Sequence, residues 1–173
     1  MTETASGLNR ASPLARLLDA PMRPGSVTWI GLRPARRKPL LAVAQANFDP
    51  VLGLIGDHYQ SRTNHARQVT LIQAEHIAAI ASHLGTGAID PGLLRRNIVV
   101  SGINLHALRG QRFQLGTALL VATGECHPCS RMEEILGTGG YNAVRGHGGM
   151  TARVIRPGRV CLGDAIARAD TPF

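Results

Sequence analysis

The segment Gly124-Glu-Cys-His-Pro-Cys-Ser-Arg-Met132 holds the two cysteines whose spacing most clearly suggests chemistry. Two cysteines separated by two residues can bind a metal, form a redox disulfide or supply one reactive thiolate. A structural zinc site needs a second ligand pair, and beyond this segment the chain offers only Cys161 and histidines such as His147. A thioredoxin-like site needs a βαβ unit, which the surrounding pattern lacks. Two small residues buried at a strand end remain the alternative.

The position of the cysteines favours a functional interpretation. They follow the apolar segment 118–122, which we expect to be a core strand, so the scaffold can hold a side chain at the mouth of a cleft. A nearby cation such as Arg131 favours the thiolate form of a cysteine. A thiolate is a soft donor and therefore suits a heavier transition metal.

A second candidate binding feature is the sequence Arg95-Arg-Asn97, which precedes an expected buried strand. Paired guanidinium groups suit phosphate, and an asparagine amide can fix the orientation of a ligand. The alternative is a basic loop with a capping asparagine. The glycines of Gly146-His-Gly-Gly149 would let backbone amides approach an anion, although such loops also form tight turns.

These candidate residues need a scaffold, and the hydrophobic pattern predicts a mostly-β one. Residues 75–84 have apolar positions at helical spacing, and the glycines that follow would end a helix there. The other apolar segments are short and many are rich in β-branched residues, as strands are. They are residues 27–30, 40–44, 68–72, 99–102, 112–115, 118–122, 151–155, 159–162 and 165–168. We therefore predict a β-barrel or strongly curved sheet with a few short α-helices.

The last part of the chain suggests a closing hairpin. Segments 151–155 and 159–162 flank Pro157-Gly158, a pair that is typical of turns. We therefore expect these two strands to pair with each other. Alternation along the second strand predicts that Cys161 packs inward as a small apolar residue.

The bulk composition indicates one domain. A chain of 173 residues suits a single sizeable core, which we place at residues 26–173, after a lead-in at 1–25. Three cysteines, an odd number, argue against a disulfide framework and favour a reducing cytoplasm. No apolar run reaches the ~20 residues that a membrane helix needs, so we expect no membrane partner.

The charge of the chain indicates an anionic partner. The formal net charge of +8 suits a phosphate, a nucleic acid or an acidic small molecule. Aromatic residues make up only 3%, whereas many nucleic-acid binders stack bases on aromatic side chains. A basic nucleic-acid-binding module is therefore supported by charge alone.

The order of several motifs along the chain resembles the MOSC domain, which is named after the C-terminal domain of molybdenum cofactor sulfurases. The resemblance runs from about Ser26 to the end of the chain. It implies a β-rich, barrel-like fold, a molybdenum–pterin cofactor and an association with sulfur transfer. It is carried by segment 68–72 with Glu75, segment 94–102, the strand ending in Cys126-His-Pro-Cys129, segment 152–155 and Gly163-Asp164.

The resemblance to the amidoxime-reducing branch of this family also implies roles for single residues. Cys129 would be the catalytic residue and metal ligand, while Arg95 and Asn97 would hold the pterin phosphate. His127 stands where that branch places a small polar residue, and we assign it, with Arg67, to the same cofactor-binding set.

The chain also departs from that branch. It lacks the branch's β-rich N-terminal domain and any desulfurase domain, and Arg96 replaces a proline that is common between the arginine and the asparagine. The closeness of Cys126 to Cys129 leaves open whether Cys126 shares or replaces the role of Cys129.

We expect a molybdenum-dependent oxidoreductase that reduces small N-hydroxylated substrates with electrons from a donor protein. The alternative is a carrier of persulfide sulfur or of the molybdenum cofactor, which would have a sulfur-donor partner. Both hypotheses use Cys129, so the sequence does not separate them.

Overall fold

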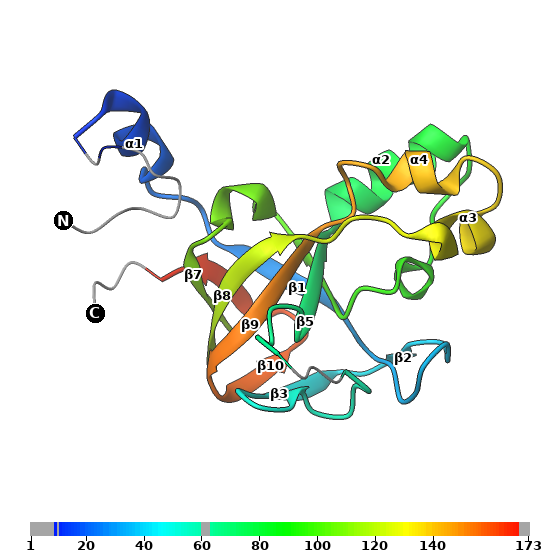
Figure 1. Cartoon of the computed structure of the whole chain (residues 1–173), viewed down its shortest axis with the longest axis horizontal. Coiled ribbons are helices and arrows are strands. Elements are labelled where there is room, and N and C mark those ends of the chain that lie inside the picture. Colours follow the sequence, from blue (N-terminus) through cyan, green and yellow to red (C-terminus); the bar gives the residue numbers. More distant parts are fainter. Residues whose placement is uncertain (1–8, 10, 60–62, 170–173) are drawn as a thin grey trace.

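Seven strands close into a barrel in the computed structural model, which describes residue 9 and residues 11–59 and 63–169 (Figure 1). Strand β1 closes the ring because its first residues pair with β11, Gly25 with Ile166 and Ser26 with Ala165. Neighbouring strands are antiparallel except β5 and β6, which are parallel. The order around the barrel is β11 (Ala165–Arg168), β7 (Arg112–Leu115), β8 (Ala118–Glu125), β9 (Met150–Arg156), β5 (Val69–Gln73), β6 (Ile98–Ser101) and β1 (Gly25–Leu32).

The barrel interior is filled by side chains that alternate along its strands. In β7, for example, Phe113 and Leu115 are buried while Arg112 and Gln114 are exposed. One apolar cluster, in which Leu, Ile, Val and Ala predominate, occupies this interior. The predicted fold class, a β-barrel with a few short helices, is confirmed.

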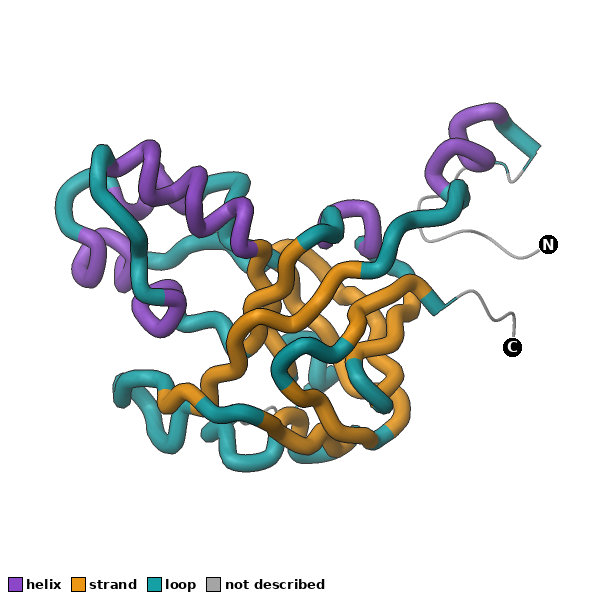
Figure 2. The backbone as a smooth tube through the Cα atoms, turned by 180° about the vertical axis from the view of Figure 1, so that it is seen from behind, coloured by secondary structure: helices purple, strands orange, loops and turns teal. Residues whose placement is uncertain are grey.

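A layer of short helices covers one side of the barrel (Figures 1 and 2). A second apolar cluster lies between these helices and strands β5 and β6, and it includes Ile80, Leu94 and Met132. The predicted helix at 75–84 is confirmed as α2, and it ends at Gly85 in a left-handed conformation. The layer consists of α2 (Ala74–Leu84), α3 (Ser130–Leu136), α4 (Gly140–Val144) and the 3₁₀ helix η1 (Pro91–Leu94).

The segment 130–144, for which we predicted no helix, forms the two short helices α3 and α4. Gly140 makes their contact possible, because a Cβ there would lie 2.5 Å from the Met132 carbonyl oxygen. The remaining helices are η2 (Leu105–Leu108) and α1 (Pro13–Leu18), and α1 stands away from the helical layer (Figure 2).

The expected closing hairpin is wrong. Strand β9 already pairs with β8 on one side and β5 on the other, so it has no free edge for the strand that follows. That strand, β10 (Gly158–Cys161), pairs instead with β3 (Gln45–Asp49), which also pairs with β4 (Gly53–Leu54). A short strand β2 (Leu41–Ala42) pairs with β1 outside the closed ring.

The expected inward packing of Cys161 is also wrong. Val160 is buried in β10, and Cys161 on the opposite side is half-exposed, with its Sγ 3.9 Å from Gln45 Oε1. The alternation along this strand is therefore shifted by one residue, because β10 follows the register of β3 rather than that of β9.

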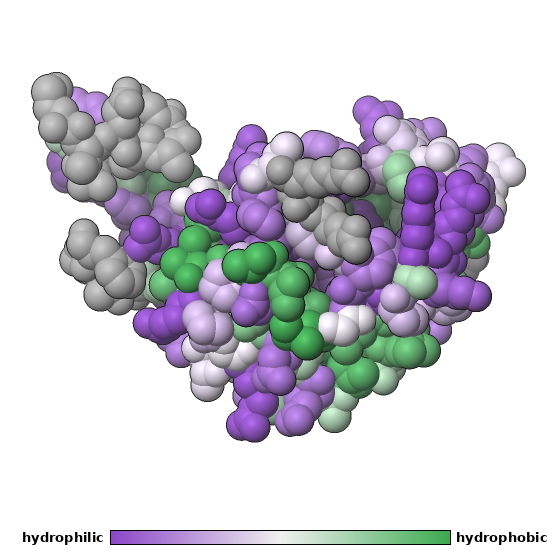
Figure 3. Space-filling view, turned by 60° about the horizontal axis from the view of Figure 1, so that its bottom comes forward, coloured by the Kyte–Doolittle hydropathy of each residue, from purple (hydrophilic) through white to green (hydrophobic). Residues whose placement is uncertain are grey.

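The small sheet and the turns beside it also carry exposed apolar side chains. Figure 3, viewed from that side, shows apolar patches within a polar surface. These side chains are Val51, Leu52, Ile55 and Leu162, and Leu41 of β2 is exposed as well. In the part of the chain that the structure describes, no helix is long and apolar enough to cross a bilayer.

Candidate functional site

The cysteine segment links the barrel to the helical layer. Strand β8 ends at Glu125, residues 126–129 form a short link, and α3 begins at Ser130 with Cys129 in the extended N-cap position. Cys126 is buried, whereas Cys129 is exposed. The two thiols therefore lie in different environments although only two residues separate them.

Cys126 is held on both sides of its backbone. Its amide donates to the Gly149 carbonyl oxygen at 2.9 Å, and Arg96 Nη2 donates to its carbonyl oxygen at 3.1 Å. Its Sγ lies 3.8 Å from Nη2 of Arg67, one of the predicted cofactor-binding residues. The Arg67 guanidinium therefore contacts the thiol of Cys126.

Arg96 is the buried charge that joins this segment to its neighbours. Its Nε donates to the Gly148 carbonyl oxygen at 2.6 Å, and its Nη1 donates to the Leu94 carbonyl oxygen at 2.8 Å. Burial lowers the pKa of Arg96, while the nearby thiols of Cys126 and Cys129 raise it. The hydrogen bonds of Arg96 therefore connect the cysteine segment, the glycine loop and η1.

The glycine loop 146–149 needs its glycines because the backbone packs closely there. A Cβ at Gly148 would lie 2.1 Å from the Cys126 carbonyl oxygen. A Cβ at Gly149, which has a φ of +87°, would lie 1.9 Å from the Leu71 carbonyl oxygen. The loop is thus packed directly against the buried cysteine.

Arg95 lies at the end of η1 with a φ of +60°. Burial lowers the pKa of Arg95, as do the neighbouring guanidinium groups of Arg33 and Arg131, whereas Cys129 raises it. Helices η1 and α3 contact each other through the apolar cluster that contains Leu94 and Met132. The structure therefore brings Arg95 into the electrostatic range of Cys129, together with two further arginines.

We call Arg33, Arg95 and Arg131 the arginine cluster. The Nε atoms of Arg33 and Arg131 are buried, and neither has a hydrogen-bond partner within the described ranges. Buried N–H groups are normally satisfied by a protein, water or ligand acceptor. An anion with several oxygen atoms, such as a phosphate, is an acceptor that suits guanidinium groups.

Asn97 is buried, and its amide is already engaged by the protein. Its Oδ1 accepts from the hydroxyl and backbone amide of Thr70, at 2.9 and 3.2 Å. Its Nδ2 donates to the Gly31 carbonyl oxygen at 3.2 Å and to Asp57 Oδ1 at 3.1 Å. Asp57 in turn lies 3.8 Å from Arg33 Nη2, so Asn97 supports the arginine cluster through Asp57. A direct contact between Asn97 and a phosphate stays a prediction.

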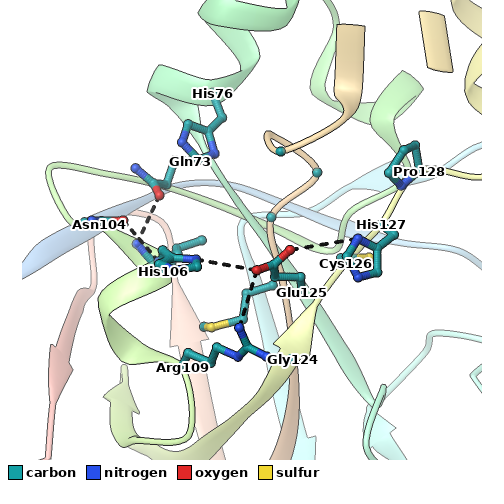
Figure 4. A pocket seen from close by; sticks show the side chains of 15 residues that line it. Gln73, His76, Asn104, His106, Arg109, Gly124, Glu125, Cys126, His127 and Pro128 are labelled. Atoms are coloured by element: carbon teal, nitrogen blue, oxygen red, sulfur yellow. Dashed lines mark hydrogen bonds and ion pairs between the residues drawn. The ribbon is translucent and has the colours of Figure 1, made fainter. Parts of the chain in front are cut away.

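A cavity of about 420 Å³ adjoins residues 124–128 of the cysteine segment (Figure 4). Its volume is within the range of small-molecule sites. His127, which we predicted as a cofactor-binding residue, lines this cavity, and its Nδ1 lies 3.9 Å from Glu125 Oε2. Other lining residues are Gln73, His76, His106, Cys126 and Gly149.

The ring of His76 connects this cavity to the glycine loop. The ring centroids of His76 and His147 are 5.0 Å apart, and His147 lies 5.1 Å from His83. Burial lowers the pKa of His76, and His147 lowers it further, whereas Glu75 raises it. Among the described residues, no three His, Cys, Asp or Glu side chains are arranged to hold a metal ion.

The sequence suggested a phosphate role for the pair Arg95-Arg96, but it did not indicate that Arg96 is buried and bonds the scaffold. It also gave no sign of Glu125 and His76, which meet the cysteine segment only in the folded chain. The sequence named Arg95 as a phosphate-binding residue and Arg131 as a cation near the thiol, but it did not indicate that Arg33 lies with them.

The fold and the site define a small β-barrel domain with an exposed thiol, a cluster of arginines and an adjoining polar cavity. The family model of the MOSC domain matches residues 57–167, and the chain belongs to the MOSC family. The predicted resemblance is thereby confirmed. No curated protein matches the chain significantly.

Solved structures share the fold of this chain. The YuaD protein from Bacillus subtilis is 24% identical, with a TM-score of 0.73 over 83% of this chain and 94% of that one. YiiM from Escherichia coli is 17% identical, with a TM-score of 0.65 over 85% of this chain and 71% of that one. YiiM from Geobacillus stearothermophilus is 15% identical, with a TM-score of 0.68 over 84% and 75% of the two chains. At these identities the likeness shows the fold alone.

Proposed function

We propose that this MOSC-family chain binds a molybdenum–pterin cofactor and reduces small N-hydroxylated substrates, with electrons from a donor protein. The observation that carries the proposal is the arginine cluster beside the exposed thiol of Cys129. One ligand that combines a phosphate with a thiophilic metal would satisfy both features at once.

The residues present fit such a cofactor. The unpartnered Nε atoms of Arg33 and Arg131 would donate to phosphate oxygens, and Arg95 would add a third positive charge. The thiolate of Cys129 would ligate the metal, since soft sulfur donors suit heavier transition metals. When bound, the cofactor supplies the two-electron redox chemistry of the proposed reaction.

The chain's own residues would then fix the position of the substrate. Arg96 and the glycine loop hold the cysteine segment, which also lines the cavity. The cavity would accept a small polar substrate beside that segment. An N-hydroxylated nucleobase is a substrate of suitable size and polarity for this proposal.

The second candidate function is a carrier of persulfide sulfur or of the cofactor. The exposure of Cys129 favours it, because a donor or acceptor protein must reach the thiol. A carrier would transfer its cargo without turning over a substrate.

One experiment separates the two functions. The protein would be produced in a host supplied with molybdate and, as a control, with tungstate. Metal and pterin would be measured, and so would turnover of an N-hydroxylated nucleobase with a reduced viologen as electron donor. Stoichiometric molybdenum and pterin with turnover, lost in the tungstate protein, supports the reductase. One added sulfur atom on Cys129 by mass, without cofactor, contradicts the reductase and supports the carrier.

A further inference from the structure

The carboxylate of Glu125 lies in the cavity wall among three basic side chains (Figure 4). His106 Nδ1 and Arg109 Nη1 each lie 3.7 Å from Glu125 Oε1, and His127 Nδ1 lies 3.9 Å from Oε2. This group is separate from the arginine cluster, and nothing in the proposed function has used it yet.

The backbone of His106 is held by hydrogen bonds at the start of η2. It lies in η2, where its backbone amide donates to Asn104 Oδ1 at 3.1 Å. The amide of the preceding residue, Leu105, donates to Gln73 Oε1 at 3.0 Å. Because Nδ1 of His106 faces the carboxylate, Nε2 is the ring nitrogen that remains for a ligand in the cavity.

A carboxylate at Nδ1 is an arrangement that suits proton transfer. A carboxylate there can orient the imidazole so that Nε2 is free to give a proton to a ligand. The side chain of His106 is also 66% exposed, so it can regain a proton from water.

The proposed reaction needs such a donor. Reduction of R–NH–OH breaks the N–O bond, consumes two electrons and two protons, and yields R–NH2 and water. The electrons come from the donor protein, and one proton must reach the leaving hydroxyl oxygen because hydroxide is a poor leaving group. We propose that His106 donates this proton and that Glu125 is the residue that positions it. This inference rests on the proposed function.

The other groups that face Glu125 and the cavity suit this role less well. Arg109 keeps its protons at neutral pH. Burial and the neighbouring His147 lower the pKa of His76, which disfavours its acid form. His127 lines the same cavity, but its Nδ1 lies farther from the carboxylate than that of His106, 3.9 Å against 3.7 Å, and its side chain is the more exposed of the two.

The test compares His106→Gln with His83→Gln in the cofactor-loaded protein. His83 is an exposed histidine of α2 that does not line the cavity, so it is the matched control. We expect His106→Gln to lower kcat at least ~10²-fold, a typical contribution of a general acid, and to leave molybdenum content and Tm unchanged. His83→Gln should keep wild-type kcat.

Two further measurements exclude a merely structural role. In His106→Ala, added imidazole should restore part of the activity, because the cavity is open to a small acid. In Glu125→Gln, kcat should fall while KM and molybdenum content stay unchanged, because the group that positions the His106 ring is lost. Independently of turnover, NMR signals of the His106 ring should move when an N-hydroxylated nucleobase is added to the cofactor-free chain.

The outcomes of the test are distinct. Loaded wild-type protein that never turns over an N-hydroxylated substrate contradicts the proposed function itself. Active wild-type protein with an equally active His106→Gln variant overturns only the inference about His106. An inactive His106→Gln variant with a lowered Tm and no rescue by imidazole in His106→Ala also overturns it, because the residue is then structural.

Discussion

Cys126 and Cys129 are separated by two residues, but they belong to two different parts of the molecule. Cys126 belongs to the barrel side: it is buried, and the Arg96 guanidinium and the glycine loop hold its backbone. Cys129 belongs to the helical layer: it is exposed at the start of α3 and lies within the electrostatic range of Arg95. The comparison shows that the two thiols are not equivalent. The Cys126 thiol is buried in the scaffold, and the Cys129 thiol is exposed.

The largest effect should come from Cys129→Ser. A protonated hydroxyl replaces a soft thiolate, so we expect molybdenum retention and reductase activity to be lost. The free energy of unfolding should change by no more than ~0.5 kcal/mol, as for other exposed positions. Metal analysis, turnover and urea unfolding measure these quantities.

Cys126→Ser and Cys161→Ser are the matched variants. A hydroxyl buried in place of the Cys126 thiol should cost about 1–2 kcal/mol and leave most of the metal bound. Cys161 is half-exposed, so its replacement should change little. Full metal and activity in Cys129→Ser, with loss of both in Cys126→Ser, would reverse the assignment of the two thiols.

Arg96→Ala should produce the largest loss of stability. It leaves the carbonyl oxygens of Leu94, Cys126 and Gly148 without their donor, and each buried unsatisfied acceptor costs roughly 1–3 kcal/mol. Relief of the buried charge offsets part of this cost, so we expect a net loss of about 3 kcal/mol by urea unfolding.

Arg95→Ala is the control for that variant. Arg95 is half-buried, and its charge belongs to the arginine cluster rather than to the scaffold. We expect it to lose cofactor affinity while its free energy of unfolding changes by less than ~1 kcal/mol. Equal stability of Arg96→Ala and wild type would refute the scaffold role of Arg96.

The three thiols of the chain should also differ in their rates of alkylation. With iodoacetamide in native buffer, Cys129 should react fastest, Cys161 more slowly and Cys126 only when the chain opens, following their exposures. Peptide mass spectrometry at successive times gives the three rates. Rapid labelling of Cys126 would show that Arg96 and the glycine loop do not close that side of the segment.

The smallest effect concerns the junction between α3, which begins after Cys129, and α4. Glu133 of α3 accepts hydrogen bonds from the backbone amides of Tyr141 and Gly139, which lower its pKa below the usual 4.5. A lowered carboxyl pKa gives stabilisation that is present above about pH 4.5 and is lost as the pH falls through the folded value. The junction between α3 and α4 should therefore loosen in acid.

Hydrogen exchange of the Gly139 and Tyr141 amides tests this at single residues. Glu133→Gln should speed their exchange at neutral pH, and the difference from wild type should shrink in acid. A difference that is the same at all pH values would mean that the carboxylate charge is not involved.

Much of the fold could be predicted from the sequence because it depends on local patterns. The helix α2 and strands such as β5, β7 and β8 have periodicities that their own residues specify. Strand partners depend on closure of the barrel, which is not local. The supposed hairpin of β9 and β10 failed for that reason, and with it the packing of Cys161.

The site was less predictable because neighbouring residues of one type face opposite ways. Nothing in the pair Arg95-Arg96 shows which guanidinium is buried. The left-handed backbone of Arg95 helps to set the directions of the two side chains, and sequence patterns predict such a conformation mainly for glycine. Similarly, the residues around Glu125 come from β8, η2 and the cysteine link, which meet only in the folded chain.

The pairing of β1 with β11 has a consequence for how the molecule folds. The ring closes between residues 25–26 and 165–166, so nearly the whole chain lies inside one loop. Contacts between distant parts of a chain slow folding, because the loop must lose its entropy before those contacts form. During synthesis the barrel must therefore stay open until β11 has left the ribosome. We expect slow refolding, and an intermediate whose unpaired strand edges make it prone to aggregate.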